Sequence, residues 1–101
     1  MKAPDYTNYL TPTDRVRVAF RQNRGNVEHF VVNYQALIDG RWRTVMRIDT
    51  CHGYAHKHTF YRNGRQYVIK WDGRVSDVFT ESVAFVKRNF ARIKDNYLRN
   101  A

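Results

Sequence analysis

The chain has 101 residues, enough for one domain with a single hydrophobic core, and we expect no second domain within it. Hydrophobic residues make up 43% of the chain and only 2 Pro and 5 Gly interrupt it, which argues against a disordered protein. The formal net charge of +9 favours polyanionic partners, with nucleic acid ahead of an acidic protein.

Residues 1–14 contain prolines and polar residues without a sustained period, which predicts an extended N-terminal arm. Residues 15–101 are expected to form a single α+β domain. Apolar and basic side chains alternate from Arg15 to Arg21, and this alternation predicts a half-buried strand near 15–22. Its apolar side chains should face the core and its arginines the solvent.

Two glycine-containing turns predict two β-hairpins. Asp39-Gly40 should join strands near 28–38 and 41–49. A two-residue turn there pairs Ile38 with Arg41, and the same register carries Val32 opposite Arg47 and Phe30 opposite Asp49. Arg47 and Asp49 are therefore expected to share one face of the sheet.

Asn63-Gly64 should join the second pair of strands, near 55–62 and 65–71. A two-residue turn pairs Arg62 with Arg65. We then expect these strands to place on one face the side chains of His56, His58, Phe60, Tyr67, Ile69 and Trp71, with His58 opposite Ile69 and His56 opposite Trp71.

A helix is predicted near 77–98, because apolar residues recur there at steps of four and three. The stripe consists of Phe79, Val83, Val86, Phe90, Ile93 and Tyr97. The expected fold is therefore a five-stranded antiparallel meander sheet covered on one face by one C-terminal amphipathic helix.

Three of the four histidines, His52, His56 and His58, fall within seven positions and follow Arg47 and Asp49. Imidazoles can take and deliver protons near neutral pH, so such a cluster fits metal-independent cleavage of RNA that begins at the ribose 2′-hydroxyl. Asp49 would orient a histidine or be held by Arg47. A phosphate would be held by the side chains of Arg47, Lys57 and Tyr54.

Two other interpretations of the cluster remain open. His56 and His58 have strand spacing and can converge on a metal ion, with His52 or Asp49 as a third ligand. Alternatively, these histidines only make hydrogen bonds in a half-buried strand. We expect no bound metal or other cofactor, and we assign a structural role to His29.

A binding module without catalysis is the alternative function, with nucleic acid or an acidic protein as its partner. Its basic stripes would consist of Arg15, Arg17, Arg21, Arg41 and Arg43. RNA is favoured over DNA, because the histidine cluster suits the 2′-hydroxyl.

Cys51 is the only cysteine, so no disulfide can form within the chain, and a cytoplasmic setting is expected. We expect its thiol to be buried and unreactive rather than a nucleophile. Neither a signal peptide nor an apolar run of about 18 residues is present, and no membrane partner is expected.

The order Arg47-x-Asp49, His52 and His56-Lys57-His58, followed by a strand and a C-terminal helix, resembles the TumE-type toxins of prokaryotic toxin–antitoxin modules. The resemblance covers roughly residues 30–99, and its specific part is residues 47–58. It implies a growth-inhibiting protein that an antitoxin partner neutralises. RNA-directed activity is an inference from the histidines.

Overall fold

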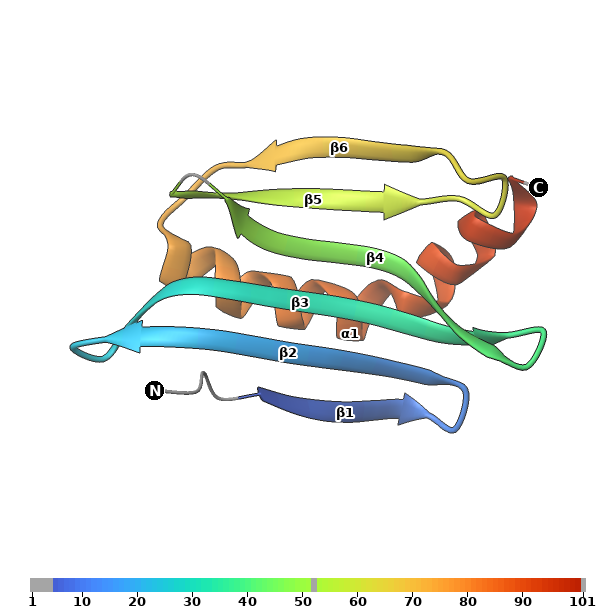
Figure 1. Cartoon of the computed structure of the whole chain (residues 1–101), viewed down its shortest axis with the longest axis horizontal. Helices are drawn as coiled ribbons and strands as arrows, with labels where there is room; N and C mark the ends of the chain where they lie inside the picture. The colour runs from blue at the N-terminus through green and yellow to red at the C-terminus, as the bar shows by residue number, and fades with distance from the viewer. Residues whose placement is uncertain (1–4, 52, 101) are drawn as a thin grey trace.

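Six strands form one antiparallel sheet in which each strand pairs with its neighbours in the sequence. The computed structural model describes residues 5–51 and 53–100. Its elements are β1 (Asp5–Thr11), β2 (Asp14–Asn23), β3 (Asn26–Ile38), β4 (Arg41–Cys51), β5 (Tyr54–Phe60), β6 (Gln66–Trp71) and α1 (Val75–Arg99). The helix runs along one face of the sheet, behind the strands in Figure 1. The α+β meander and its C-terminal helix are therefore confirmed.

The predicted count of five strands is wrong, because residues 5–11 of the expected arm form β1. This strand pairs with β2 at the edge of the sheet. Its side chains Tyr6 and Tyr9 remain 44% and 57% exposed. A strand that buries so little apolar surface needs no hydrophobic alternation, so the sequence carried no signal for it.

The core lies between α1 and the sheet face turned toward it. Val16 and Val18 of β2 are buried there, as their alternation with arginines predicts. Tyr34 of β3 meets Phe90 of α1 edge to face, with ring centroids 6.2 Å apart. The buried helix residues are Val78, Ser82, Val86 and Ile93.

A β-bulge in β4 changes the predicted register of the first hairpin. Ile38 pairs with Arg41 as expected, but the register shifts between Tyr34 and Gln35. Tyr34 pairs with Met46 and Gln35 with Thr44, so Val45 is the extra residue on β4. Both Val45 and Met46 are buried, which accounts for the bulge.

The bulge places two charged residues outside the core. Arg47 pairs with Asn33 and not with Val32, and Asp49 pairs with Val31 and not with Phe30. Val32 is fully buried beneath the helix, so a pairing of Arg47 with Val32 would have placed the charged Arg47 side chain in the core. The shift of one residue instead turns Arg47 and Asp49 toward the face that α1 does not cover.

The second hairpin also differs from the prediction by one residue. Phe60 pairs with Gln66, and the amide of Tyr61 donates to the carbonyl of Arg65, so three residues (62–64), and not two, form the turn. Two loop amides, of Arg62 and Asn63, donate to the carbonyls of Tyr97 and Asn100 near the end of α1. The longer turn therefore satisfies carbonyl groups that a helix C-terminus leaves without partners.

The changed register separates the expected ring cluster. His56 pairs with Lys70, so Trp71 and Ile69 lie on the opposite face from the histidines. Trp71 contacts Phe85 of α1, with ring centroids 5.6 Å apart. The expected sharing of one face by His56, His58 and Trp71 is therefore wrong.

A buried polar cluster ties the β1–β2 turn to β3 and α1. Asp14, only 4% exposed, accepts hydrogen bonds of 2.6 Å from both Tyr34 and Thr11, and Lys94 Nζ lies 3.6 Å from its carboxylate. Burial by itself raises the pKa of Asp14, but the hydrogen bonds from Thr11 and Tyr34 and the charge of Lys94 outweigh it and lower the pKa. Burial and Asp14 together raise the pKa of Tyr34.

Candidate functional site

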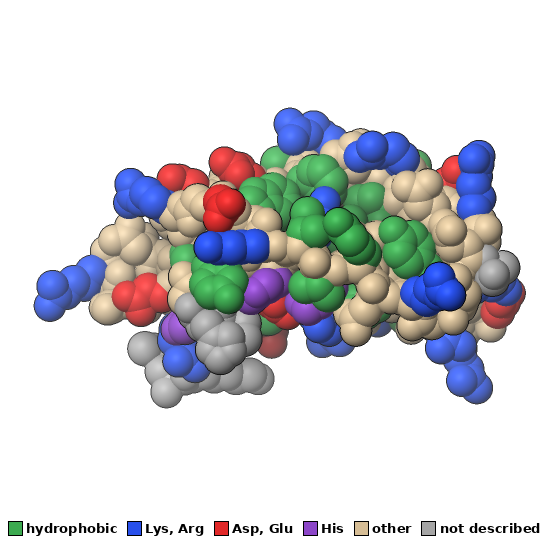
Figure 2. Space-filling view, turned by 90° about the horizontal axis from the view of Figure 1, so that it is seen from above, with side chains coloured by type: hydrophobic (Ala, Val, Ile, Leu, Met, Phe, Trp, Pro, Cys, Tyr) green, Lys and Arg blue, Asp and Glu red, His purple; other side chains and the backbone are tan. Residues whose placement is uncertain are grey.

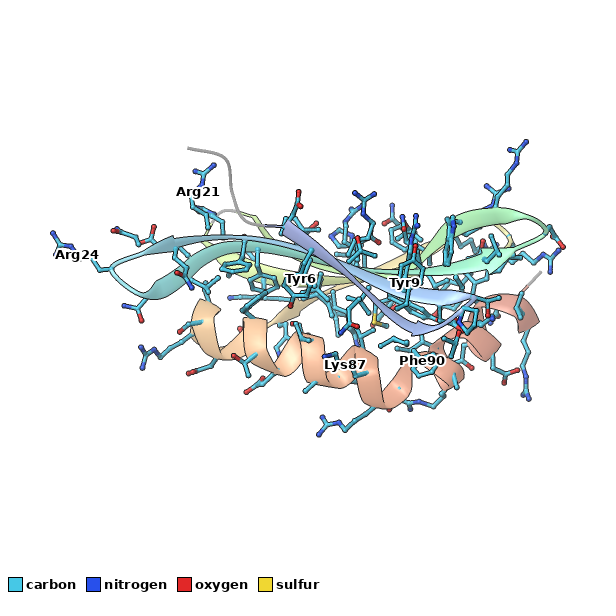
Figure 3. All side chains as sticks on the ribbon, turned by 90° about the horizontal axis from the view of Figure 1, so that it is seen from below. Tyr6, Tyr9, Arg21, Arg24, Lys87 and Phe90 are labelled. Atoms are coloured by element: carbon cyan, nitrogen blue, oxygen red, sulfur yellow. The ribbon has the colours of Figure 1, made fainter. Side chains whose placement is uncertain are left out.

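The face of the sheet opposite α1 is not covered by any other described element, and we call it the open face. In Figure 3, Arg21 projects from this side of the sheet while Lys87 lies on the helix. Residues paired across antiparallel strands share a face, so the registers identify its side chains. One row runs Thr7, Arg17, Asn33, Arg47, His58, Val68, and the next runs Asp5, Ala19, Val31, Asp49, His56, Lys70.

Arg47, Asp49 and His58 form a connected cluster at the centre of the open face. Arg47 Nε donates a 2.9 Å hydrogen bond to Asp49 Oδ2, and His58 Nε2 lies 3.3 Å from Asp49 Oδ1. The Arg47 guanidinium also lies 5.6 Å from the ring centre of Phe60. Asp49 thus holds both neighbours in place, and Arg47 neutralises its charge.

Four rings lie in a line along β5, on the open face. The centroids of Tyr54 and His56 are 4.7 Å apart, and those of His56 and His58 are 6.3 Å apart. His58 then stacks on Phe60, at 6.3 Å and nearly parallel. We call Tyr54, His56, His58 and Phe60 the ring row. Side chains two residues apart on one strand share a face, which explains this line.

The ring row has cations on both sides. Lys70 Nζ of β6 lies 4.7 Å from the Tyr54 ring centre, and Arg47 of β4 borders the other end. Further from the row, the Arg15 guanidinium lies 4.0 Å from the ring centre of Trp42 and its Nε donates to Gln35. Basic and aromatic side chains are therefore interleaved across the open face.

The structure brings together most of the residues that the sequence singled out. Arg47, Asp49, His56 and His58 are neighbours, and Tyr54 joins them. The open face also carries Arg15, Arg17 and Arg21, by their registers with Gln35, Asn33 and His29. His52, the third histidine of the predicted cluster, lies outside the described residues.

Three predicted binding residues lie elsewhere. Arg41 and Arg43 alternate with Trp42 along β4 and so point to the other side from the Arg15–Trp42 contact. Lys57 faces the helix, with its Nζ 5.2 Å from the ring centre of Phe85. The open face therefore lacks these three cations.

Sequence reasoning missed Lys70 and Trp42 as neighbours of the site. The predicted pairing of His56 with Trp71 placed Lys70 on the face opposite the histidines, whereas Lys70 pairs with His56. The unpredicted bulge at Val45 means that Trp42 lies on the same face as Arg47. Identifying both requires the correct registers, including the bulge at Val45 that interrupts the alternation along β4.

One nitrogen of the His58 ring faces Asp49, and the other is buried. Within the described residues, Nδ1 of His58 and Oδ1 of Asn33 are buried and make no hydrogen bond. A substrate cannot reach a buried nitrogen, so this arrangement suits His58 to positioning. His56, half-buried beside Tyr54, is the better placed histidine for proton transfer.

Among residues 5–51 and 53–100, no group of three or more His, Cys, Asp or Glu side chains is placed to hold a metal ion. The metal hypothesis with His52 as a ligand extends beyond this part of the chain. No helix in the same ranges combines the length and apolar character needed to cross a membrane.

The chain belongs to the family described as Domain of unknown function (DUF7718), whose model matches residues 1–101. No curated protein and no solved structure matches it. The resemblance to TumE-type toxins therefore stays a prediction.

Proposed function

We propose that this member of the DUF7718 family binds single-stranded nucleic acid, with RNA favoured, on the open face of its sheet. The observation that carries the proposal is the ring row on β5, flanked by Arg47 and Lys70 on the one broad face that α1 leaves uncovered. Rings that stack on bases, together with cations that follow the phosphates, are the usual means of binding single strands.

The geometry favours unpaired bases over a duplex. A base pair keeps its faces stacked inside the double helix, whereas an unpaired base can lay its face on a side-chain ring. Tyr54 begins the ring row and is 37% exposed, so one base can stack there without rearrangement of the sheet.

Charge supports the same partner. The open face carries the cations Arg15, Arg17, Arg21, Arg47 and Lys70 alongside the acids Asp5 and Asp49. Asp49 is already engaged by Arg47, so it offers little repulsion to a phosphate. Release of counterions from the phosphates should then contribute much of the affinity.

The test is fluorescence anisotropy with a labelled single-stranded RNA, the same sequence as DNA, and an RNA duplex. We expect Tyr54→Ala to weaken binding of the single-stranded RNA by roughly 5- to 100-fold, the usual effect of removing one stacked ring. Tyr67→Ala is the matched control, because Tyr67 is 61% exposed but lies on the other face of β6. Equal losses in both variants, or tighter binding of the duplex, would overturn the proposal.

RNA cleavage on the same face is a second candidate function, and the contact between Asp49 and His58 favours it. His56 would take the proton of the ribose 2′-hydroxyl, whose oxygen attacks the phosphorus of the phosphate held by Arg47. The bond from phosphorus to the 5′-oxygen would break, and the leaving 5′-oxygen would take a proton from water, while Asp49 and His58 would position the neighbouring groups. The resemblance to TumE-type toxins adds growth inhibition and an antitoxin partner to this candidate.

His56→Gln separates the two candidates. The substitution removes one ring of the ring row, so we expect weaker RNA binding; for the cleaving enzyme, cleavage should be lost even when the RNA saturates the variant, together with any inhibition of growth upon expression in bacteria. Arg17→Gln should instead weaken both binding and cleavage. Undiminished cleavage by His56→Gln would eliminate the second candidate and leave the binding proposal standing.

A further inference from the structure

The two edges of the sheet differ in how well they are protected against pairing with a strand of another chain. β1 has an irregular register between Tyr9 and Thr11, and Pro12 follows it directly. β6 pairs with β5 without a shift over Gln66–Trp71 and contains no proline. Within the described residues no strand pairs with the other side of β6. A regular edge without a bulge or a proline is open to pairing with another peptide strand.

Apolar side chains gather around this open edge. Figure 2 looks onto the β6 side of the molecule and shows apolar side chains running along it. Tyr67 and Val68 are 61% and 44% exposed. Beside them lies a hollow of about 260 Å³, lined by Lys57, Ile69, Lys70, Trp71, Asp72 and Phe85. The hollow lies where β6 approaches α1, as the contact of Trp71 with Phe85 indicates.

Lysines give this hollow a positive charge. Lys57 Nζ lies 5.2 Å from the Phe85 ring centre and 6.0 Å from that of Trp71. Within residues 5–51 and 53–100 it forms no ion pair. Lys70 is paired only with the exposed Asp72, at 3.4 Å. A half-buried cation without a carboxylate partner favours an acidic occupant.

We propose that β6 binds an extended acidic segment of a partner protein, which adds a seventh strand to the sheet. Backbone hydrogen bonds along β6 would supply affinity, a ladder that nucleic acid cannot form. Alternate side chains of the segment would face the hollow, where an acidic one reaches Lys57 and an apolar one covers Trp71. A second copy of this chain is disfavoured, because each copy carries a formal net charge of +9.

The probe is a nine-residue peptide of alternating Val and Glu with blocked ends, titrated into isotopically labelled protein and followed by NMR. We expect changes in the NMR chemical shifts of the backbone amides of β6 and not in those of β1. Two matched peptides test the mode of binding: one has Lys in place of each Glu, and one is N-methylated at alternate residues, so that it cannot complete a strand ladder. Both should bind at least about tenfold more weakly, because the Lys peptide loses its hydrogen bonds to charged groups and the N-methylated peptide loses several backbone hydrogen bonds.

Lys57→Met keeps the length of the side chain and removes its charge, and we expect it to weaken binding of the acidic peptide by about tenfold or more. Lys87→Met is the matched control, because Lys87 is exposed on α1 away from the sheet. Equal binding by both variants, shifts confined to β1, or equal binding of the N-methylated peptide would overturn the proposal. Self-association that perturbs β6 without any peptide would also overturn it and assign the edge to a second copy.

Discussion

Replacing Tyr34 by Phe removes one hydrogen bond to a buried carboxylate and leaves the packed ring in place. The Tyr34 hydroxyl donates to Asp14 Oδ1 at 2.6 Å, and Asp14 is 4% exposed. A hydrogen bond to a charged group contributes about 1.5–3 kcal/mol. We therefore expect Tyr34→Phe to lower the free energy of unfolding by about 1.5–3 kcal/mol at pH 7, because Thr11, Thr13 and Lys94 still hold Asp14.

The same cluster makes this effect depend on pH. Folding lowers the pKa of Asp14, so its contribution to stability is present above the pKa it has in the unfolded chain, near 4, and is lost as the pH falls through its folded value. Folding raises the pKa of Tyr34, so the contribution of Tyr34 is lost as the pH rises above about 10. The difference in stability between wild type and Tyr34→Phe should therefore shrink in acid.

Urea-induced unfolding followed by circular dichroism, at pH 7 and at steps down to about pH 2, measures both effects. Tyr67→Phe is the matched control, because Tyr67 is 61% exposed and its hydroxyl makes no hydrogen bond with the described residues. Equal unfolding free energies for the two variants at pH 7 would refute the assigned role of Tyr34. A difference between wild type and Tyr34→Phe that stays constant into acid would refute the assigned role of Asp14.

Three further predictions concern the turns, the register and the open face. Deleting Val45 removes the bulge but leaves Thr44 opposite Gln35 and Met46 opposite Tyr34, so Arg47 stays on the open face; we expect a folded chain by circular dichroism whose free energy of unfolding in urea is lower by about 1.5–3 kcal/mol, from the loss of one buried side chain, and an unfolded deletion variant would contradict the register. Gly40→Val places a branched residue at φ 77° and should lower the free energy of unfolding in urea by about 1–2 kcal/mol, whereas an unchanged value would contradict the turn geometry. Arg17→Gln should reduce by about one the slope of log binding constant against log salt for single-stranded RNA, while Arg43→Gln, outside the open face, should leave it unchanged; equal slopes would remove Arg17 from the interface.

Local patterns predicted the elements that bury apolar surface. Val16 and Val18 alternate with arginines, and only one side of a strand can face the core, so the orientation of β2 followed from its sequence. Asp39-Gly40 predicted the tight turn between β3 and β4, and both residues have positive φ, at 53° and 77°. β1 could not be predicted in the same way, because backbone pairing holds it and few of its side chains are buried.

The grouping of Arg47, Asp49, His56 and His58 was predicted, although both hairpin registers behind it were wrong by one residue. The grouping depends on the pairing of β4 with β5, where Arg47 lies opposite His58 and Asp49 opposite His56. Neither the bulge nor the second turn lies between those residues, so the two errors left the group intact. The errors did affect the predicted neighbours of this group: the residue opposite His56 is Lys70 and not Trp71.

The sequence by itself determined the class of fold, the apolar side of β2, the stripe of α1 and the tight turn after β3. Only the tertiary structure decided which face carries the site. Packing of α1 on the sheet buries Val45 and Met46 together, and this places the bulge that turns Arg47 and Asp49 outward. The end of α1 likewise accepts hydrogen bonds from Arg62 and Asn63 and so selects the three-residue turn. Each register was decided by contacts with a helix distant in the sequence, which the local residues of a hairpin do not encode.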